Sequence, residues 1–382
     1  MAVNLIYSNL LSLSMPEYKN QHFVPQFYMR GWANNDRVST YNLDRQSEFP
    51  PTNISNLCSE DYFYDKDGEH ERALSGLEGR HATLLQTLRT DRSVDNLTRD
   101  DLYHLCIFVR FQAARTKSTR SEGEQIKDWI FKEVTRTGVE AGELDVSALE
   151  AVENGEINME FKHHNWLHSS SMLHALAGPN ILFDMGISLI ENQTDSEFVF
   201  SDHPVYLDNR RFKSEQEKFL LGIQNRGLQV FLPLSADLLL HLYDPACYRI
   251  EHDDEDSQLV QVDSPQIVND LNGTQLINAD RHIFYGQNDS EDEMQSLQDR
   301  LSESISADFA QFERHENGIP EIDRDNPILM SGPRVPDFSP RLPFIKQVVD
   351  VEHEVKRSPA LARKVEKQIE AAKENAQNTS SG

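Results

Sequence analysis

The chain has 382 residues, with 37 Lys or Arg against 63 Asp or Glu, and its net charge is −26. Such a field repels polyanions, so binding of nucleic acid over a broad surface is disfavoured; basic residues gather only around residues 110–120. The three cysteines lack Cys-x-x-Cys spacing, which argues against a disulfide framework or a cysteine-rich zinc site. No apolar stretch approaches the roughly 18 to 20 residues that cross a bilayer. The sequence therefore predicts a soluble, cytoplasmic protein without a membrane partner.

The apolar spacing predicts an α+β fold, with mainly helical layers packed on a largely antiparallel sheet. Strand patterns occur at residues 37–43, 62–64, 183–190, 197–200, 227–235, 238–243 and 282–285, and helix patterns at 69–88, 98–120, 161–177 and 264–279. We expect one domain over residues 1–290 with a charged helical insertion at about 121–158. Residues 291–382 read as an acidic, proline-rich linker and a C-terminal helix, which could bind a protein partner.

The segment from His22 to Arg30 reads His-Phe-Val-Pro-Gln-Phe-Tyr-Met-Arg. It combines polar side chains with apolar residues that can anchor it in the core. Pro25 has a preset φ and no N–H, so we expect it to open a short helix with His22 just before it. Gln26 and Arg30 then share one helix face. The segment, which also holds Tyr28, is either part of a site or a well-capped core helix.

Two helices are predicted to carry a second group of polar residues beside their apolar stripes. Glu78 lies four residues after Leu74, where a carboxylate needs a partner, a raised pKa or contact with water. Gln112 falls within the stripe of the next helix, and Arg115 follows three residues later. The Arg115 guanidinium suits phosphate or carboxylate, and the alternative is an Arg115 to Glu78 ion pair between adjacent helices.

A third group follows the strand that ends at Phe200. Asp202 and His203 come next, before a proline, which is a common position for catalytic or metal-binding carboxylates. Asp202 could equally cap the following turn through backbone hydrogen bonds. Asn272 borders the buried stripe of a later helix that Ser264-Pro265 opens.

Taken in order, these segments resemble a bacterial family, the domain of unknown function numbered 4238. The resemblance rests on His22-Phe-Val-Pro-Gln26-Phe-Tyr-Met-Arg30, Gln112-Ala-Ala-Arg115-Thr116, Phe200-Ser-Asp202-His-Pro-Val205, Pro233-Leu-Ser235 and Asn272, and spans roughly residues 18–286. Met29 stands where the family pattern has Leu, and His203 where it has Asn. The resemblance implies that these residues belong together, and it implies no particular reaction.

The polar residues come from at least five segments, and such convergence favours an active site over a passive surface. Our first hypothesis is a hydrolase that cleaves a phosphodiester, either a nuclease or a nucleotide-acting effector of a bacterial defence or toxin system. In it Arg30 and Arg115 hold phosphate, His22 is the general acid or base, and Glu78 with Asp202 binds Mg²⁺ or Mn²⁺. The full expected sets are His22, Glu78, Asp202 and Gln112 for catalysis, and Gln26, Tyr28, Arg30, Arg115, His203 and Asn272 for substrate binding.

The substrate would be a nucleotide or nucleic acid in a local cleft. One alternative is a non-catalytic interaction protein of a defence or toxin–antitoxin pair, in which the same polar residues form a structural network. Another is a glycosidase-like or transferase enzyme that uses Glu78 and Asp202. The sequence has no P-loop, GxGxxG, GxSxG or HExxH motif, and it carries no nicotinamide, flavin or haem signature.

Overall fold

The structure is a computed structural model that describes residues 19–64, 69–159, 166–177, 179–210, 222–252, 258–287, 291–305, 310–315, 328–333, 338–348 and 356–357. Its helices are α2 (Gln26–Met29), α3 (Glu69–Asp91), α4 (Arg99–Ala114), α5 (Lys117–Glu140), α6 (Val146–Glu153), α7 (Trp166–Ala177), α9 (Pro265–Asn278) and α10 (Glu291–Leu301), with short 3₁₀ turns at Ile54–Asn56 and Pro179–Leu182. The predicted α+β class, with largely antiparallel sheets, is confirmed.

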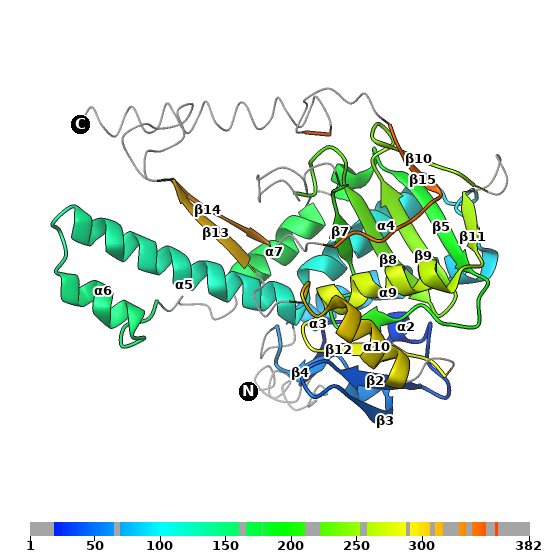
Figure 1. Cartoon of the computed structure of the whole chain (residues 1–382), viewed down its shortest axis with the longest axis horizontal. Helices are drawn as coiled ribbons and strands as arrows, with labels where there is room; N and C mark the ends of the chain where they lie inside the picture. Colours follow the sequence, from blue (N-terminus) through cyan, green and yellow to red (C-terminus); the bar gives the residue numbers. More distant parts are fainter. Residues whose placement is uncertain are drawn as a thin grey trace, which may run out of the picture.

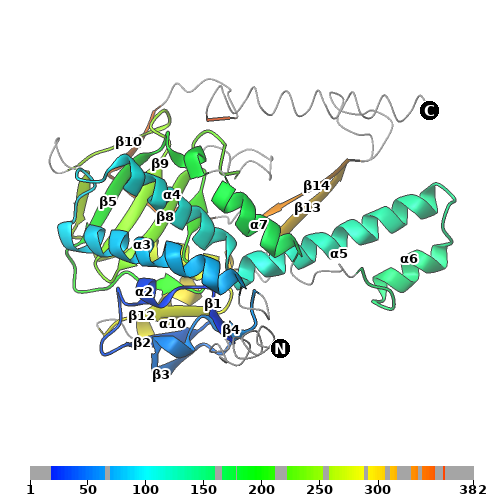
Figure 2. The same ribbon diagram turned by 180° about the vertical axis from the view of Figure 1, so that it is seen from behind.

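A five-stranded sheet forms the centre of the body (Figure 1). Its strand order is β11 (Leu259–Val262), β5 (Gly186–Asn192), β9 (Leu238–Tyr243), β8 (Gln229–Ser235) and β7 (Tyr206–Asp208). Only the β11 to β5 pair is parallel within this sheet, and the other three pairs are antiparallel. Helices α3 and α4 cross one face (Figure 2), and α9 and α10 lie on the opposite side (Figure 1).

Successive residues of these strands enter two different cores, as the two-residue period of a strand requires. Leu189 and Leu232 pack into the core beneath α3 and α4. Their neighbours Ile190 and Phe231 pack into the core beneath α9 and α10. Both faces are buried, which explains why the sequence of β8 is a continuous apolar run instead of an alternating one.

A second, four-stranded antiparallel sheet lies beside the first. Its order is β3 (Ser47–Asn53), β2 (Arg37–Asn42), β12 (His282–Tyr285) and β6 (Phe200–Ser201). Strand β12 pairs with both β2 and β6, and so brings together three segments far apart in the sequence. Two short two-stranded pairs complete the N- and C-terminal regions: β1 (Asn20–His22) with β4 (Ser59–Asp61), and β10 (Tyr248–Ile250) with β15 (Ile345–Gln347).

Helix α4 begins at a capping box and ends earlier than predicted. The Thr98 hydroxyl accepts the Asp101 N–H, and the Asp101 carboxylate accepts the Thr98 N–H, so both bonds of a capping box are present. We expected one helix to Arg120, whereas the chain breaks at Thr116, which is extended, and α5 starts at Lys117. The Thr116 hydroxyl lies 2.5 Å from His203 Nδ1, and this contact holds the break in place.

Helices α5 and α6 form an arm that projects from the body (Figure 1). The hairpin of β13 (Ala310–His315) and β14 (Ile328–Pro333) lies along α5. Trp129 stacks on Phe312 with ring centroids 5.0 Å apart, and Arg314 forms ion pairs with Glu133 and Glu140. This arm occupies the region in which we expected a charged helical insertion.

Part of the chain beyond residue 290 packs into the body, although its acidic, proline-rich composition predicts a linker there. Met294 and Leu297 of α10 and Leu342 and Phe344 near β15 are buried in the core beneath α9. Apolar residues spaced along an acidic helix provide this packing, since only one face of α10 has to be apolar. The predicted C-terminal helix (about 347–376) lies almost entirely outside the described residues. No helix within the described ranges is both long and apolar enough to cross a membrane.

Candidate functional site

Arg115 lies at the centre of one group of predicted site residues, which we call the Arg115 network. Its Nη1 donates to Glu78 Oε1 at 2.9 Å, its Nη2 to the His22 carbonyl at 2.5 Å, and its Nε to the Tyr64 hydroxyl at 2.9 Å. The Arg115 side chain is 3% exposed and that of Glu78 is 28% exposed. The network therefore contains the ion pair that we considered as an alternative to phosphate binding.

His22 and Gln26 border this network. The Gln26 amide nitrogen lies 3.5 Å from His22 Nε2. Burial lowers the pKa of His22, while the nearby Ile54 carbonyl acts in the opposite direction. The structure thus brings His22, Gln26, Glu78 and Arg115 together, as a common site requires, but the guanidinium is already occupied by protein groups.

Two further predicted residues support the backbone. The Tyr28 hydroxyl donates to the Pro233 carbonyl at 2.6 Å, and Tyr28 is fully buried, which raises its pKa well above the usual value. Gln112 Nε2 donates to the Phe23 carbonyl at 3.0 Å. Both side chains fix α2 and its neighbouring residues against the body, and neither presents a group to solvent.

Arg30 lies apart from these residues, at the C-terminal end of α2. Its Nε lies 3.7 Å from Asp36 Oδ1, and both side chains are more than half exposed. We expected Gln26 and Arg30 to share one helix face, but α2 ends at Met29 and the Arg30 side chain is exposed to solvent. Among the described residues, no hydrogen bond or ion pair connects Arg30 with the Arg115 network. The structure therefore does not support a phosphate site shared by the two arginines.

Helix α9 holds the segment around Asp202 through amide side chains. Asn272 donates to the Glu197 carbonyl at 2.8 Å and accepts the Val199 N–H at 3.0 Å. His203 follows Asp202, and its Nδ1 lies 2.5 Å from the Thr116 hydroxyl. Burial lowers the pKa of His203 to about 4. These contacts give Asn272 and His203 structural roles in place of the substrate contacts that we expected.

Asp202 is the predicted residue that the structure connects most directly to a cavity. Its carboxylate accepts the backbone N–H groups of Asp280, Arg281 and His282 at 2.8, 3.0 and 2.9 Å. This is the capping alternative, although the capped residues follow α9 and are not those after Asp202 itself. Its Oδ2 also lies 3.5 Å from His282 Nδ1.

We expect Asp202→Asn to lower the free energy of unfolding by about 2 to 4 kcal/mol, because an amide turns an N–H₂ group toward backbone donors that need an acceptor. Urea denaturation of wild type and variant measures this difference. Asp195→Asn, on an exposed turn, is the control and should change stability by less than about 0.5 kcal/mol. A fully stable Asp202→Asn variant would show that the carboxylate does not anchor these three N–H groups.

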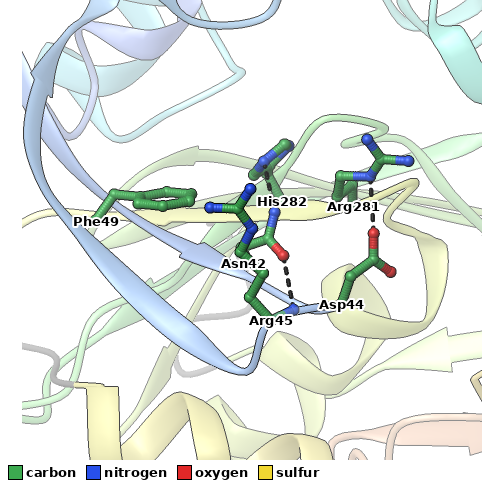
Figure 3. A pocket seen from close by; sticks show the side chains of 6 residues that line it. All are labelled: Asn42, Asp44, Arg45, Phe49, Arg281 and His282. Atoms are coloured by element: carbon green, nitrogen blue, oxygen red, sulfur yellow. Dashed lines mark hydrogen bonds and ion pairs between the residues drawn. The ribbon is translucent and has the colours of Figure 1, made fainter.

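An open cavity of about 400 Å³ lies beside His282, which is one of its lining residues (Figure 3). It is lined by Asn42, Asp44, Arg45, Phe49, Arg281 and His282. The hairpin between β2 and β3 supplies the first four residues, and the start of β12 supplies the last two. His282 is the direct cross-strand partner of Asn42, which places both side chains on one face of the sheet.

The hydrogen bonds in this cavity define the tautomer of neutral His282. The Arg45 N–H donates to Asn42 Oδ1 at 2.8 Å, so the Asn42 amide nitrogen is the group that faces the imidazole. That nitrogen lies 3.0 Å from His282 Nε2 and can only donate. In neutral His282 the proton is therefore on Nδ1, toward Asp202, and Nε2 carries the lone pair on the side of the cavity.

Two arginines supply positive charge at the cavity. Arg281 forms an ion pair with Asp44 at 2.9 Å, in which both side chains are more than half exposed. The Arg45 guanidinium lies over the Phe49 ring, 5.6 Å from its centroid, and makes no ion pair within the described residues. The cavity thus combines an oriented imidazole, an aromatic ring and a guanidinium that has no ion pair among the residues the structure describes.

Asp202 was predicted from the sequence as a site residue, whereas His282, Arg45 and Arg281 were not. The sequence shows His282 as the first residue of a short strand, and nothing local relates it to Asn42, 240 residues earlier. Only the pairing of β2 with β12 brings them together.

The predicted metal pair, Glu78 and Asp202, receives no support from the arrangement of ligands. Glu78 is bound by Arg115, and Asp202 is bound by three backbone N–H groups. Within the described ranges, no group of three or more His, Cys, Asp or Glu residues is placed to hold a metal ion.

The family model described as a protein of unknown function, DUF4238, matches residues 20–289, which include both the Arg115 network and the cavity. The chain belongs to the DUF4238 family. The match contains all the predicted site residues of this DUF4238 protein and both helices of the arm, and ends before α10. No curated protein and no solved structure matches the chain.

Proposed function

We propose that this DUF4238 protein is a hydrolase that cleaves a phosphodiester, with the cavity at His282 as its active site. The observation that carries the proposal is the contact of Asp202 with His282 Nδ1, which turns the Nε2 lone pair toward the cavity. Arg45 and Arg281 line the same cavity and suit a phosphate group. His22, which we first expected to be the general base, is replaced in this role by His282.

The proposed reaction uses His282 as a general base. After the substrate displaces the Asn42 amide, Nε2 accepts a proton from a water molecule as that water attacks phosphorus. Asp202 then stabilises the resulting imidazolium through Nδ1–H, and the arginines stabilise the added negative charge. The bond from phosphorus to the leaving oxygen breaks, and the imidazolium returns the proton to that oxygen.

The test is hydrolysis of bis(4-nitrophenyl) phosphate, RNA, single-stranded DNA and dinucleotides, in EDTA and with added Mg²⁺ or Mn²⁺. We expect His282→Asn to reduce the rate on the substrate that wild type cleaves by at least about 100-fold. Thermal melting of the variant should match wild type. His174→Asn, at an exposed position on α7, is the matched control and should keep full activity.

Retention of activity by His282→Asn would reject His282 as the base. Absence of hydrolysis by folded wild type on every substrate would reject the enzyme proposal. The metal arms test the earlier expectation of Mg²⁺ or Mn²⁺ separately from the role of His282.

A second candidate function is a non-catalytic interaction protein, and the arm favours it. Ile130, Val134, Leu144 and Val146 on α5, on α6 and on their connection are 36%, 57%, 45% and 59% exposed. Apolar side chains grouped on a projecting element are typical of protein interaction surfaces. A folded protein that hydrolyses nothing in the panel would favour this candidate over the hydrolase. A defence or toxin role fits either candidate and remains part of the proposal.

A further inference from the structure

The size of the cavity bears on which phosphodiesters it could accept. Its volume of about 400 Å³ lies in the range of sites that enclose one small ligand, roughly 300 to 1,000 Å³. Its walls come from one hairpin and the start of one strand, so it forms a compact recess and not an extended groove. A ligand of about one nucleotide fits this space.

The Arg45 and Phe49 side chains are of the kinds that bind nucleotides in proteins. In Figure 3 the Arg45 guanidinium lies between the Phe49 ring and Asn42. A phosphate bound by Arg45 would therefore lie near both the Phe49 ring and the Asn42 to His282 contact. Aromatic rings and guanidinium planes both stack on nucleobases, and a guanidinium also binds phosphate.

Negative charge around the cavity disfavours a longer substrate. Asp44 is one of its walls, and Asp280 immediately precedes Arg281. On the same hairpin the Glu48 N–H donates to the Glu291 carboxylate at 3.1 Å, which brings another acid to β3. A polynucleotide extends beyond the two arginines toward these carboxylates, within a chain of net charge −26.

The exposed Arg281 to Asp44 ion pair can open at little cost. Such exposed pairs stabilise a protein only weakly, so the phosphate group of a ligand can replace Asp44 as the partner of Arg281. Arg45 needs no such exchange, because it has no carboxylate partner within the described residues. Both guanidinium groups are thus available to phosphate at the cavity.

We infer that the cavity recognises a nucleotide-sized ligand, with its phosphate on Arg45 and Arg281 and its base against Phe49, and that it does not recognise a polynucleotide. The inference rests on the proposed function and narrows its substrate to cyclic mononucleotides or phosphodiesters of similar size.

Calorimetric titration of the His282→Asn variant tests binding without hydrolysis. The probes are the four ribonucleoside 5′-monophosphates, the corresponding nucleosides, inorganic phosphate and a ten-nucleotide RNA. We expect at least one monophosphate to bind tenfold or more tightly than both its nucleoside and inorganic phosphate. The RNA should bind no more tightly than that monophosphate.

Phe49→Leu should weaken binding of the monophosphate by about tenfold and leave phosphate binding unchanged. Phe183→Leu is the matched control, since Phe183 is 39% exposed and lies outside the cavity, and it should bind like its parent. Melting temperatures verify that each variant folds.

Equal affinity for phosphate and every monophosphate would overturn recognition of the base, and tighter binding of the RNA would overturn the limit on size. Absence of binding by all probes would overturn the inference as a whole. None of these results concerns the rate loss in His282→Asn, so failure of the inference is distinguishable from failure of the proposed hydrolase.

Discussion

Replacing Glu78 with Ala is expected to lower the free energy of unfolding by about 3 to 5 kcal/mol. Glu78 is the only carboxylate within the described residues that forms an ion pair with Arg115, whose side chain is 3% exposed. Without Glu78 the guanidinium keeps its bonds to the His22 carbonyl and the Tyr64 hydroxyl, but its charge stays buried without a counter-ion. Urea denaturation at pH 7.5 measures the loss.

A double variant separates the buried charge from other effects of the substitution. Glu78→Ala combined with Arg115→Met removes both charges, so we expect it to be more stable than Glu78→Ala alone. Glu150→Ala, at an exposed position on α6, is the control and should change stability by less than about 0.5 kcal/mol. If Glu78→Ala costs under 1 kcal/mol, Glu78 is not a structural counter-ion, and it returns as a candidate for chemistry.

The Arg115 network shows what could be predicted from the sequence. Helical spacing placed Glu78 and Arg115 beside apolar stripes of consecutive helices, and a buried charge needs a partner, so their ion pair was one of two stated outcomes. The capping box at Thr98 and the start of α9 after Ser264 were also predictable, because each depends on residues within one turn.

The cavity shows what could not be predicted. His282 acquires its orientation from Asn42 and Asp202, which lie on two other strands, and the order of strands in a sheet has no local signal in one sequence. The capping role of Asp202 likewise involves backbone groups almost 80 residues later. Similar reasoning applies to Arg115, since its hydrogen bond to the His22 carbonyl depends on how α4 meets β1.

Lowering the pH from 7.5 to 5 is expected to destabilise the protein by on the order of 5 kcal/mol, comparable with the whole stability of many domains. Burial lowers the pKa of His81, His168 and His203 to about 4 and that of His241 to about 3. Nearby positive charges add to this effect, including His104 beside His81 and Arg120 beside His168.

The sign follows from the protons bound in each state. In the unfolded chain these histidines titrate near pH 6.5, so between pH 6.5 and 4 the unfolded state binds protons that the folded state does not. Their contribution to stability is complete above pH 6.5 and is lost as the pH falls. Glu122 acts in the opposite direction by one proton, because burial raises its pKa to about 7. The four histidines outweigh it.

His168→Phe provides the decisive comparison for the acid sensitivity. The imidazole packs against the rings of Phe63 and Tyr64, with centroids 5.4 and 6.2 Å away, so a phenyl ring suits the position. Urea denaturation at several pH values should show a shallower dependence in the variant, by up to one proton between pH 6.5 and 4. His174→Asn, at an exposed position, should keep the wild-type dependence. An unchanged dependence in His168→Phe would mean that His168 binds its proton over the same pH range in the folded and unfolded states, and the acid loss would then have to arise from the other buried histidines.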